Sequence, residues 1–548
     1  MIEQNTEAFL PDVWEGAVME PNGPDASRVA ALMETLLEEH GAPRCREALA
    51  RFVIERLPPG PLYIHGCGTH SRLLLSLLAA NRPDIVVCGM LDRLATEGTN
   101  FAGLPVQRPE ELTLEEGAKI LVAHTSFEGE MVRSLLAAGI PNEKIIRTYS
   151  SRAFADVADG TVPEIPLPRT GDPLSMIVSC SNVGIVSDEH LLTIFPADQT
   201  VYIHMGRQDC FTPHPYFRSF DLLESVRNLI EAIRNFKPRV VYIRPIIYKN
   251  YLPALVKYFC PQTRVVAEYY DFTFLWTTQD LISLFGLDQV SIAMLKSSEY
   301  VGTRILDYIL SKRGGPEWQY LTSDWIVKTE LYFPLVSEFH QDNPKISAIR
   351  DFAYAGFLPS PKFLRQFNTG YNFLSDLQVL CKNHDFKAII YNSGHTEENF
   401  EESFTAYYKT FSGDPIAYRG RIPYEELMVQ LQTIRYGWLC EHWTGFQGDR
   451  HVGVCNRWTG YVSAGIPVLI DAGWRFMGAL VRRFEAGIIV EVFTPDAIAA
   501  AVQAADHDRL RQGVKALRRH LIEHNEATMT KLAAIVAAGS LHITDTVP

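Results

Sequence analysis

The feature that most constrains the fold of this chain is an alternation of short apolar segments with amphipathic segments, which recurs in three successive regions. In the first region "PLYIHG", "DIVVCGML", "AKILVAH" and "KIIRTY" have the length of buried strands, whereas "THSRLLLSLLAAN" and "FEGEMVRSLLAAG" have helical spacing. Alternating strands and helices predict parallel sheets with right-handed crossover connections. We therefore expect an α/β protein built from three Rossmann-like parallel-sheet domains.

The second and third regions repeat the pattern with other segments. Strands are expected at "LSMIVSCS", "TVYIHM", "RVVYIRP" and "RVVAEYY", and then at "DFAYAGFL", "KAIIYNS", "PIAYRG", "YGWLCE", "IPVLID" and "GIIVEV". The Pro- and Gly-rich residues 159–173 read as a linker. The predicted organisation is a helical segment at 1–58, a Rossmann-like domain at 59–158, sheet domains at 173–345 and 346–495, and C-terminal helices at 496–548.

The helical segment at 1–58 contains two amphipathic stretches, "SRVAALMETLLEEHG" and "RCREALARFVIERL". They are interpreted either as a packing element or as a hairpin for self-association, so a homo-oligomer stays open.

Composition narrows the class of protein and its compartment. A formal net charge of −13 over 548 residues argues against a nucleic-acid partner. The nine cysteines occur singly, without CxxC spacing, which indicates neither a zinc site nor a disulfide scaffold and favours a cytoplasmic location. The N-terminal sequence "MIEQNTEAFLPDVWEG" does not resemble a signal peptide, and no apolar run is long enough for a membrane span. Peripheral membrane contact stays open.

A glycine-rich turn, "GCGTHS", follows the first expected strand. Gly66, Gly68 and Ser71 stand where a phosphate could approach the backbone at the start of a helix, and Asp92 ends the second strand, where a ribose-binding acid would lie. The following "LDRLATEGTNFAGLPVQRPEEL" resembles the small Rossmann-like domain of sugar-modifying proteins, which implies nucleotide or nucleotide-sugar binding. The alternative is a sheet domain retained for assembly.

The third region places polar residues at the ends of its strands. Lys362 follows "YAGFL", Arg421 follows "PIAYRG", and Glu441 ends "YGWLC". In "NRWTGYVSAGIPVLI", Asn456 is expected to cap a helix with Arg457 in its first turn, and Gly465 to end that helix. In open α/β sheets ligands bind at the carboxyl ends of the strands, so these residues are expected at one site.

The order of "YAGFLPSPK", "YRGRIPYEELMVQL", "YGWLCEHW" and "NRWTGYVSAGIPVLI" resembles the C-terminal half of glycosyltransferases of the B fold. It is closest to galactofuranosyltransferase-like members of family 4, over about residues 350–495. The resemblance implies that the last two sheet domains form a pair with an interdomain cleft, and that the final helix crosses back onto the second domain. It also implies a nucleotide-diphosphate sugar as donor, no required cofactor and no metal.

In that fold the implied donor-binding residues are Lys362, Arg421, Glu441, Asn456, Arg457, Tyr461 and Gly465, with Asn182 and Gly184 from the second domain. The chemistry agrees, because a diphosphate needs cations or helix N-termini that are already in place. Arg457 stands where the family carries a lysine, and its planar fork suits bidentate phosphate contact. Gly460 and Val452 occupy the positions of two glutamates that many members carry, so that recognition pair is absent.

The acceptor side is expected in the second domain. Glu268 and Asp271 end one of its strands in "AEYYDF", and either carboxylate could take the proton of an acceptor hydroxyl as general base. Their alternative role is to cap or shape a loop.

The predicted reaction is therefore transfer of a sugar from a nucleotide-diphosphate donor to a hydroxyl of a glycan, lipid-linked or protein acceptor. Two other interpretations stay open. One is a catalytically silent fold used for binding or assembly, which the absent glutamate pair favours. The other is a transferase fused to an NAD-dependent sugar-modifying domain, which Asp92 favours.

Overall fold

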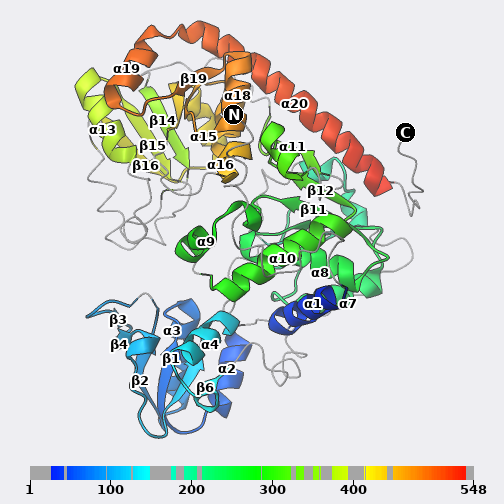
Figure 1. Ribbon diagram of the computed structural model, residues 1–548, viewed down its shortest axis with the longest axis vertical. Helices are drawn as coiled ribbons and strands as arrows, with labels where there is room; N and C mark the ends of the chain where they lie inside the picture. Colours follow the sequence, from blue (N-terminus) through cyan, green and yellow to red (C-terminus); the bar gives the residue numbers. More distant parts are fainter. Residues whose placement is uncertain are drawn as a thin grey trace. The chain divides into compact units, whose positions relative to one another are not determined.

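The computed structural model (Figure 1) describes most of the chain. The described residues are 26–41, 46–93, 95–124, 128–147, 175–180, 190–206, 213–285, 287–322, 329–337, 350–356, 358, 373–392, 413, 415–440 and 448–537. By internal packing they form two units. Unit 1 comprises the described parts of Tyr270–Gly286 and Leu310–Pro548, and unit 2 those of Asp12–Tyr269 and Leu287–Ile309.

The first sheet belongs to unit 2 and has the strand order β3-β4-β2-β1-β5-β6. Its strands are β1 (Gly60–His65), β2 (Ile85–Leu91), β3 (Asn100–Phe101), β4 (Leu104–Gln107), β5 (Lys119–Val122) and β6 (Ile145–Ile146). Its helices are α3 (Thr69–Asn81) and α4 (Glu128–Ala137). The pairs are parallel, as predicted, except for the short β3–β4 hairpin, whose turn places Ala102 and Gly103 at positive φ.

The two N-terminal helices are α1 (Ala26–His40) and α2 (Arg46–Arg56), as the helical spacing predicts. They pack on different partners within unit 2. α2 lies against α3 of the first sheet, whereas α1 lies against helices α7, α8 and α10 that flank the second sheet. Met33 and Leu36, on the inner face of α1, are almost fully buried by this packing.

The second sheet has the order β13-β12-β11-β10-β7-β8-β9. Its strands are β7 (Ser175–Ser179), β8 (Thr200–His204), β9 (Arg218–Asp221), β10 (Val240–Arg244), β11 (Arg264–Tyr269), β12 (Tyr308–Ser311) and β13 (Thr329–Leu331). The helices are α7 (Val226–Phe236), α8 (Leu252–Phe259), α9 (Thr278–Phe285), α10 (Gln289–Ile305) and α11 (Pro316–Thr322). β7, β8 and β10 are buried along their whole length, which explains why their sequences are continuous apolar runs rather than alternating ones.

The third sheet lies in unit 1 and has the order β16-β15-β14-β17-β18-β19, with every neighbouring pair parallel. Its strands are β14 (Arg350–Gly356), β15 (Ala388–Asn392), β16 (Ile416–Gly420), β17 (Ile434–Leu439), β18 (Val468–Asp471) and β19 (Gly487–Val490). Strand order therefore runs outward in both directions from β14, and reverses between β14 and β17. Such a reversal creates a crevice at the carboxyl ends of the two strands.

Helices cover both faces of the third sheet, each over its own apolar cluster. They are α13 (Phe373–His384), α15 (Tyr424–Leu431), α16 (Gly448–Val452), α17 (Asn456–Ala464), α18 (Arg475–Phe484), α19 (Pro495–Ala504) and α20 (His507–Ala537). The prediction of an α/β fold with three mostly parallel sheets is thus confirmed. The predicted domain boundaries and interdomain cleft stay predictions, and the linker at 159–173 lies outside the described residues.

The long helix α20 runs beside α18 (Figure 1) and α17, within unit 1. Asn525 exchanges two hydrogen bonds with the backbone of Phe333, and the Thr528 hydroxyl donates to the carbonyl of Leu331. The final helix is therefore hydrogen-bonded at β13, the edge strand of the second sheet, and its crossing onto the second domain stays a prediction. None of the described helices is long and apolar enough to cross a membrane.

Candidate functional site

The crevice between β14 and β17 is closed from below by Tyr461. The two strands are in register only as far as Ala353 and Gly437. Beyond that point the fully buried Tyr461 hydroxyl accepts from the Ala355 N–H at 2.9 Å and donates to the Ala353 carbonyl at 3.0 Å. A side chain thus replaces the missing strand partner, since buried backbone groups need a hydrogen bond.

Arg457 lies directly above this closure, at the start of α17. Its guanidinium carbon is 4.5 Å from the centre of the Tyr354 ring, and an added Cβ on Gly356 would lie 2.6 Å from Arg457 Cδ. Glycine at the last position of β14 is what lets the arginine pack against the strand end. The sheet therefore brings Arg457 to the point where strand order reverses.

The start of α17 differs in one detail from the sequence prediction. Cys455 is the N-cap residue and makes no side-chain capping bond, so Asn456 is the first helical residue instead of the cap. Asn456 is exposed there. The first backbone N–H groups of a helix have no partner within the helix, and they carry the positive end of its dipole. Gly465 ends the helix in the left-handed conformation, with φ of 75°, as expected.

A cavity of about 510 Å³ opens beside Gly356, at the carboxyl ends of β14, β15 and β16. Its lining residues are Ala355, Gly356, Tyr391, Asn392, Gly420, Arg421, Ile422, Pro423, Tyr424 and Leu427. The predicted Arg421 is exposed at its rim. Its floor is fixed, because the fully buried Asn392 side chain accepts from the Leu358 N–H and donates to the Tyr418 hydroxyl.

Tyr391 adds a neutral polar group to this cavity. Its hydroxyl donates to Gln430 at 2.6 Å, and burial raises its pKa to about 12, against smaller opposing effects of nearby arginines. The cavity therefore combines one cation, aromatic surface and neutral hydrogen-bonding groups. That is a lining suited to a polar organic ligand with negative charge.

The predicted donor-binding residues, apart from Asn456 and Gly465 at the two ends of α17, divide into three groups. Arg421 and Arg457 lie at or beside the cavity, while Tyr461 is buried and holds β14 to α17 from below. Lys362, Glu441, Asn182 and Gly184 lie outside the described residues.

Asp271, in unit 1, is bound to two cations. Its Oδ1 lies 3.1 Å from an Arg313 nitrogen and 3.4 Å from Lys312 Nζ. Burial acts to raise the pKa of Asp271, but the charges of Lys312 and Arg313 outweigh it and leave the pKa below its ordinary value. A carboxylate held ionised in this way is a weaker proton acceptor than one with a pKa near neutrality.

Glu268, in unit 2, is almost fully buried at the end of β11. Its Oε2 accepts from the Tyr242 hydroxyl at 2.7 Å and lies 2.9 Å from Arg244 Nε. His190 lies 3.9 Å away. These contacts fix the carboxylate within the second sheet, so a proton acceptor at this position would act from a rigid, paired site.

The carboxyl edge of the first sheet gathers the residues of the glycine-rich turn. Gly66 has φ of 115°, a conformation that favours glycine, and its carbonyl accepts from the buried Ser71 hydroxyl. Gly68 is the exposed N-cap of α3. Asp92 follows β2, where its backbone N–H donates to the Gln107 carbonyl at 3.0 Å. The turn, the helix start and the acid therefore all lie at this edge.

His65 is a residue of this edge that sequence reasoning missed. It is the last residue of β1 and is 3% exposed, and its Nδ1 has no hydrogen-bond partner among the described residues. Burial, with help from nearby His124 and Arg93, lowers its pKa to about 4. The signal that could have found it is position, since His65 directly precedes the glycine-rich turn.

We expect His65 to make the folded state sensitive to acid. Its folded pKa lies below the ordinary 6.5, so stability is fully present above pH 6.5 and is lost as the pH falls toward 4. The loss is about 3 kcal/mol for a shift of this size. Thermal unfolding of the wild type and of His65→Gln between pH 4 and 7 measures it, and the variant should show the flatter profile. Equal profiles would contradict the assignment.

No group of three or more His, Cys, Asp and Glu side chains placed to hold a metal ion occurs among the residues that the structure describes.

Comparison with known proteins gives similarity to solved structures only. No family model matches the sequence, and no curated protein matches it. The chain is similar to HepE from Anabaena in complex with UDP-glucose, with 9% identity and a TM-score of 0.45 over 66% of this chain and 99% of that one. It is also similar to a putative UDP-N-acetylglucosamine 2-epimerase from Listeria monocytogenes, with 10% identity and a TM-score of 0.42 over 66% and 97% of the two chains. A third is the spinosyn forosaminyltransferase SpnP, with 12% identity and a TM-score of 0.38 over 66% and 99%.

Proposed function

We propose that this chain is a glycosyltransferase that moves a sugar from a nucleotide-diphosphate donor to a hydroxyl of a glycan, lipid-linked or protein acceptor. The observation that carries the proposal is the position of Arg457. It stands at the start of α17, against Gly356 at the end of β14, the strand from which the order of the third sheet reverses. Gly356 also lines the cavity at the carboxyl ends of β14, β15 and β16. The sequence around it resembles the donor-binding half of B-fold glycosyltransferases.

In this proposal the diphosphate lies between Arg457 and the first N–H groups of α17. The guanidinium offers two parallel donors to phosphate oxygens, and the helix start offers backbone donors that need no rearrangement. As the sugar leaves, negative charge grows on the diphosphate, and fixed donors stabilise that charge without a metal ion. Arg421 and the polar groups of the adjoining cavity then contact the rest of the donor.

The acceptor hydroxyl must lose a proton, and Glu268 and Asp271 are the proposed acceptors of it. The ion pairs of Asp271 with Lys312 and Arg313 keep it unprotonated and ready to accept, at the cost of basicity. Glu268→Gln and Asp271→Asn keep the shape of each side chain but remove its charge. These variants therefore distinguish a chemical role of the carboxylate from a packing role.

A second candidate is a catalytically silent protein that binds a nucleotide or a nucleotide sugar. The absent glutamate pair favours it. Val452 and Gly460 stand at those positions, and both are buried in α16 and α17, where neither offers a polar side chain. In this case the third sheet would bind its ligand without turnover. The fused nicotinamide-dependent domain is a third candidate, since Asp92 directly follows β2 of the first sheet.

Calorimetric titration of the full chain with uridine, guanosine and thymidine diphosphates, their sugar conjugates and NAD separates these candidates. Binding of a nucleotide sugar together with release of its sugar to water or to an added acceptor supports the transferase. Binding without any release supports the silent protein. Binding of NAD that is lost in Asp92→Ala supports the fused domain, and no binding of any diphosphate contradicts the proposal.

Gly356→Ala tests the contact that places Arg457. The new Cβ would lie 2.6 Å from Cδ and 2.9 Å from Nε of Arg457, so the flexible arginine must move while the backbone stays. We expect nucleotide affinity to fall about tenfold, or 1.4 kcal/mol, with little change in thermal stability. Gly478→Ala is the matched control, because its Cβ would meet only Ile489 at 4.0 Å. Unchanged nucleotide affinity in Gly356→Ala would show that Arg457 does not contact the ligand.

A further inference from the structure

A second cavity, of about 330 Å³, lies within unit 2 at the junction of α1, α4 and α10. We call it the α1–α4–α10 cavity. Part of its wall is apolar, from Leu36, Val132, Leu136, Leu287, Met294 and Leu295. The aromatic rings of His40 and Tyr251, stacked 4.4 Å apart, form another part. None of the candidate site residues named above lines it.

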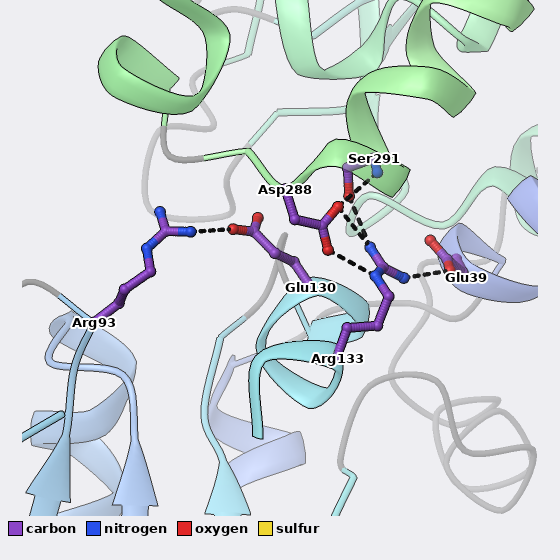
Figure 2. Close-up of polar contacts among 6 residues, drawn as sticks. All are labelled: Glu39, Arg93, Glu130, Arg133, Asp288 and Ser291. Carbon is purple, nitrogen blue, oxygen red and sulfur yellow. Dashed lines mark hydrogen bonds and ion pairs between the residues drawn. The ribbon is translucent and has the colours of Figure 1, made fainter. Parts of the chain in front are cut away.

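Two of the cations that line this cavity are already bound to carboxylates. Figure 2 shows Arg133 with its Nε 2.6 Å from Asp288 and further bonds to Ser291 and Glu39. Lys249 lies 3.1 Å from Glu224 and also donates to a backbone carbonyl. Neither charge is available to attract an anion into the cavity.

Glu130, on α4, is the acid that is left incompletely bound. Its side chain lines the cavity and is 7% exposed. Oε1 accepts from Arg93 at 3.1 Å, but the buried Oε2 has no hydrogen-bond partner among the described residues (Figure 2). A buried carboxylate oxygen without a donor is unfavourable. Burial raises the pKa of Glu130 to about 7, the charge of Asp288 raises it further, and Arg93 and Arg133 oppose the shift.

Three other carboxylates line the cavity, those of Glu38, Glu39 and Glu128. The third cation of the lining, Arg147, bonds to the neutral amide of Asn142, so the lining holds four carboxylates and three cations. The cavity therefore offers a buried acceptor, an excess of carboxylates and an apolar wall. Such a combination complements a positively charged donor attached to a short hydrocarbon chain.

We propose that the α1–α4–α10 cavity binds a small primary amine, whose ammonium group donates to Oε2 of Glu130 while its alkyl chain lies on the apolar wall. The ammonium supplies the missing donor and offsets the repulsion between Glu130 and Asp288. Residues of α1, α4 and α10 line the cavity, so the bound ligand contacts all three helices. Its binding therefore stabilises the packing of α4, a helix of the first sheet, on α1 and α10.

Calorimetric titration of the full chain with butylamine tests this site, with butanol and butyrate as neutral and anionic analogues of equal length. We expect butylamine to bind and the two analogues not to bind. Glu130→Gln keeps the shape of the side chain but removes its charge, and should weaken the binding of butylamine at least about tenfold. Glu116→Gln, an exposed acid away from the cavity, is the matched control and should bind as the wild type does.

The pH dependence provides an independent readout. The charged and titratable groups that act on Glu130 or line the cavity with it are Arg93, Arg133, Asp288, Glu128, Glu39, Glu38, His40, Arg147, Tyr248, Tyr251 and Lys249. Affinity for butylamine should rise as the pH increases through about 7, because Glu130 ionises while the ammonium keeps its charge. Glu130→Gln should remove this dependence.

A second variant leaves the charges intact. Leu136→Trp enlarges a side chain that is 41% exposed at the cavity wall, so it should fill the space without unfolding α4, and butylamine binding should be lost. The proposal is overturned if butylamine does not bind, if butanol or butyrate binds equally well, or if Glu130→Gln binds with unchanged affinity.

Discussion

Arg457→Ala should reduce affinity for a nucleoside diphosphate about a hundredfold while leaving the fold intact. A guanidinium that makes two charge-assisted hydrogen bonds contributes roughly 3 kcal/mol, and about 1.4 kcal/mol corresponds to a factor of ten. The arginine is half-buried, with its stem against Gly356 and its guanidinium over the Tyr354 ring, so its loss removes charge and some packing but no backbone support.

Arg457→Lys separates charge from geometry. Lysine keeps the positive charge but lacks the planar fork of arginine. It is also the residue carried at this position by the B-fold glycosyltransferases that the sequence resembles. We therefore expect an intermediate affinity, above that of Arg457→Ala. Arg482→Ala is the matched control, because Arg482 is exposed on α18 in the same unit and pairs only weakly with the exposed Glu491 at 3.6 Å. Equal affinity of Arg457→Ala and wild type in calorimetric titration would remove the main support for the proposed function.

Gly437→Ala should be the most destabilising single change near the same crevice. An added Cβ on β17 would overlap the Tyr461 ring. That ring cannot retreat, since it is fully buried and its hydroxyl is bonded to two backbone groups of β14. Overpacking costs about 1–3 kcal/mol, and loosened backbone bonds add to it. We expect a loss of about 3 kcal/mol in the unfolding of unit 1.

Gly460→Ala is the control for this prediction, because it adds the same methyl group on α17, at the residue directly before Tyr461. A Cβ on Gly460 would meet nothing within 4 Å, and its φ is not in the left-handed region. Alanine in the middle of α17 should therefore stabilise the helix by about 1 kcal/mol. Thermal unfolding, followed together with hydrogen exchange in β14, compares the two variants. A Gly437→Ala protein as stable as Gly460→Ala would show that Tyr461 does not close the crevice.

Most of the regular structure could be predicted from the sequence, because it follows from local patterns. The run "THSRLLLSLLAAN" coincides with α3, and "LSMIVSCS" and "RVVYIRP" contain β7 and β10. Buried parallel strands need continuous apolar runs, and amphipathic helices need apolar residues at helical spacing, so each signal lies within a single element. The short strands β3, β4, β9, β12 and β13 escaped prediction since so few residues carry the pattern.

Local sequence patterns alone predict an α/β protein with three mostly parallel sheets, and they place Arg457 and Arg421 at strand or helix ends. What surrounds these residues emerges only once the chain is folded. The fold reveals that Tyr461 is a buried support, that Cys455 stands ahead of α17 instead of Asn456, and that Asp271 is held by Lys312 and Arg313. It also brings Glu130, Arg93 and Asp288 together from distant parts of unit 2. The physical reason is that hydrophobic periodicity is local, whereas burial, charge pairing and pKa depend on residues far apart in the chain.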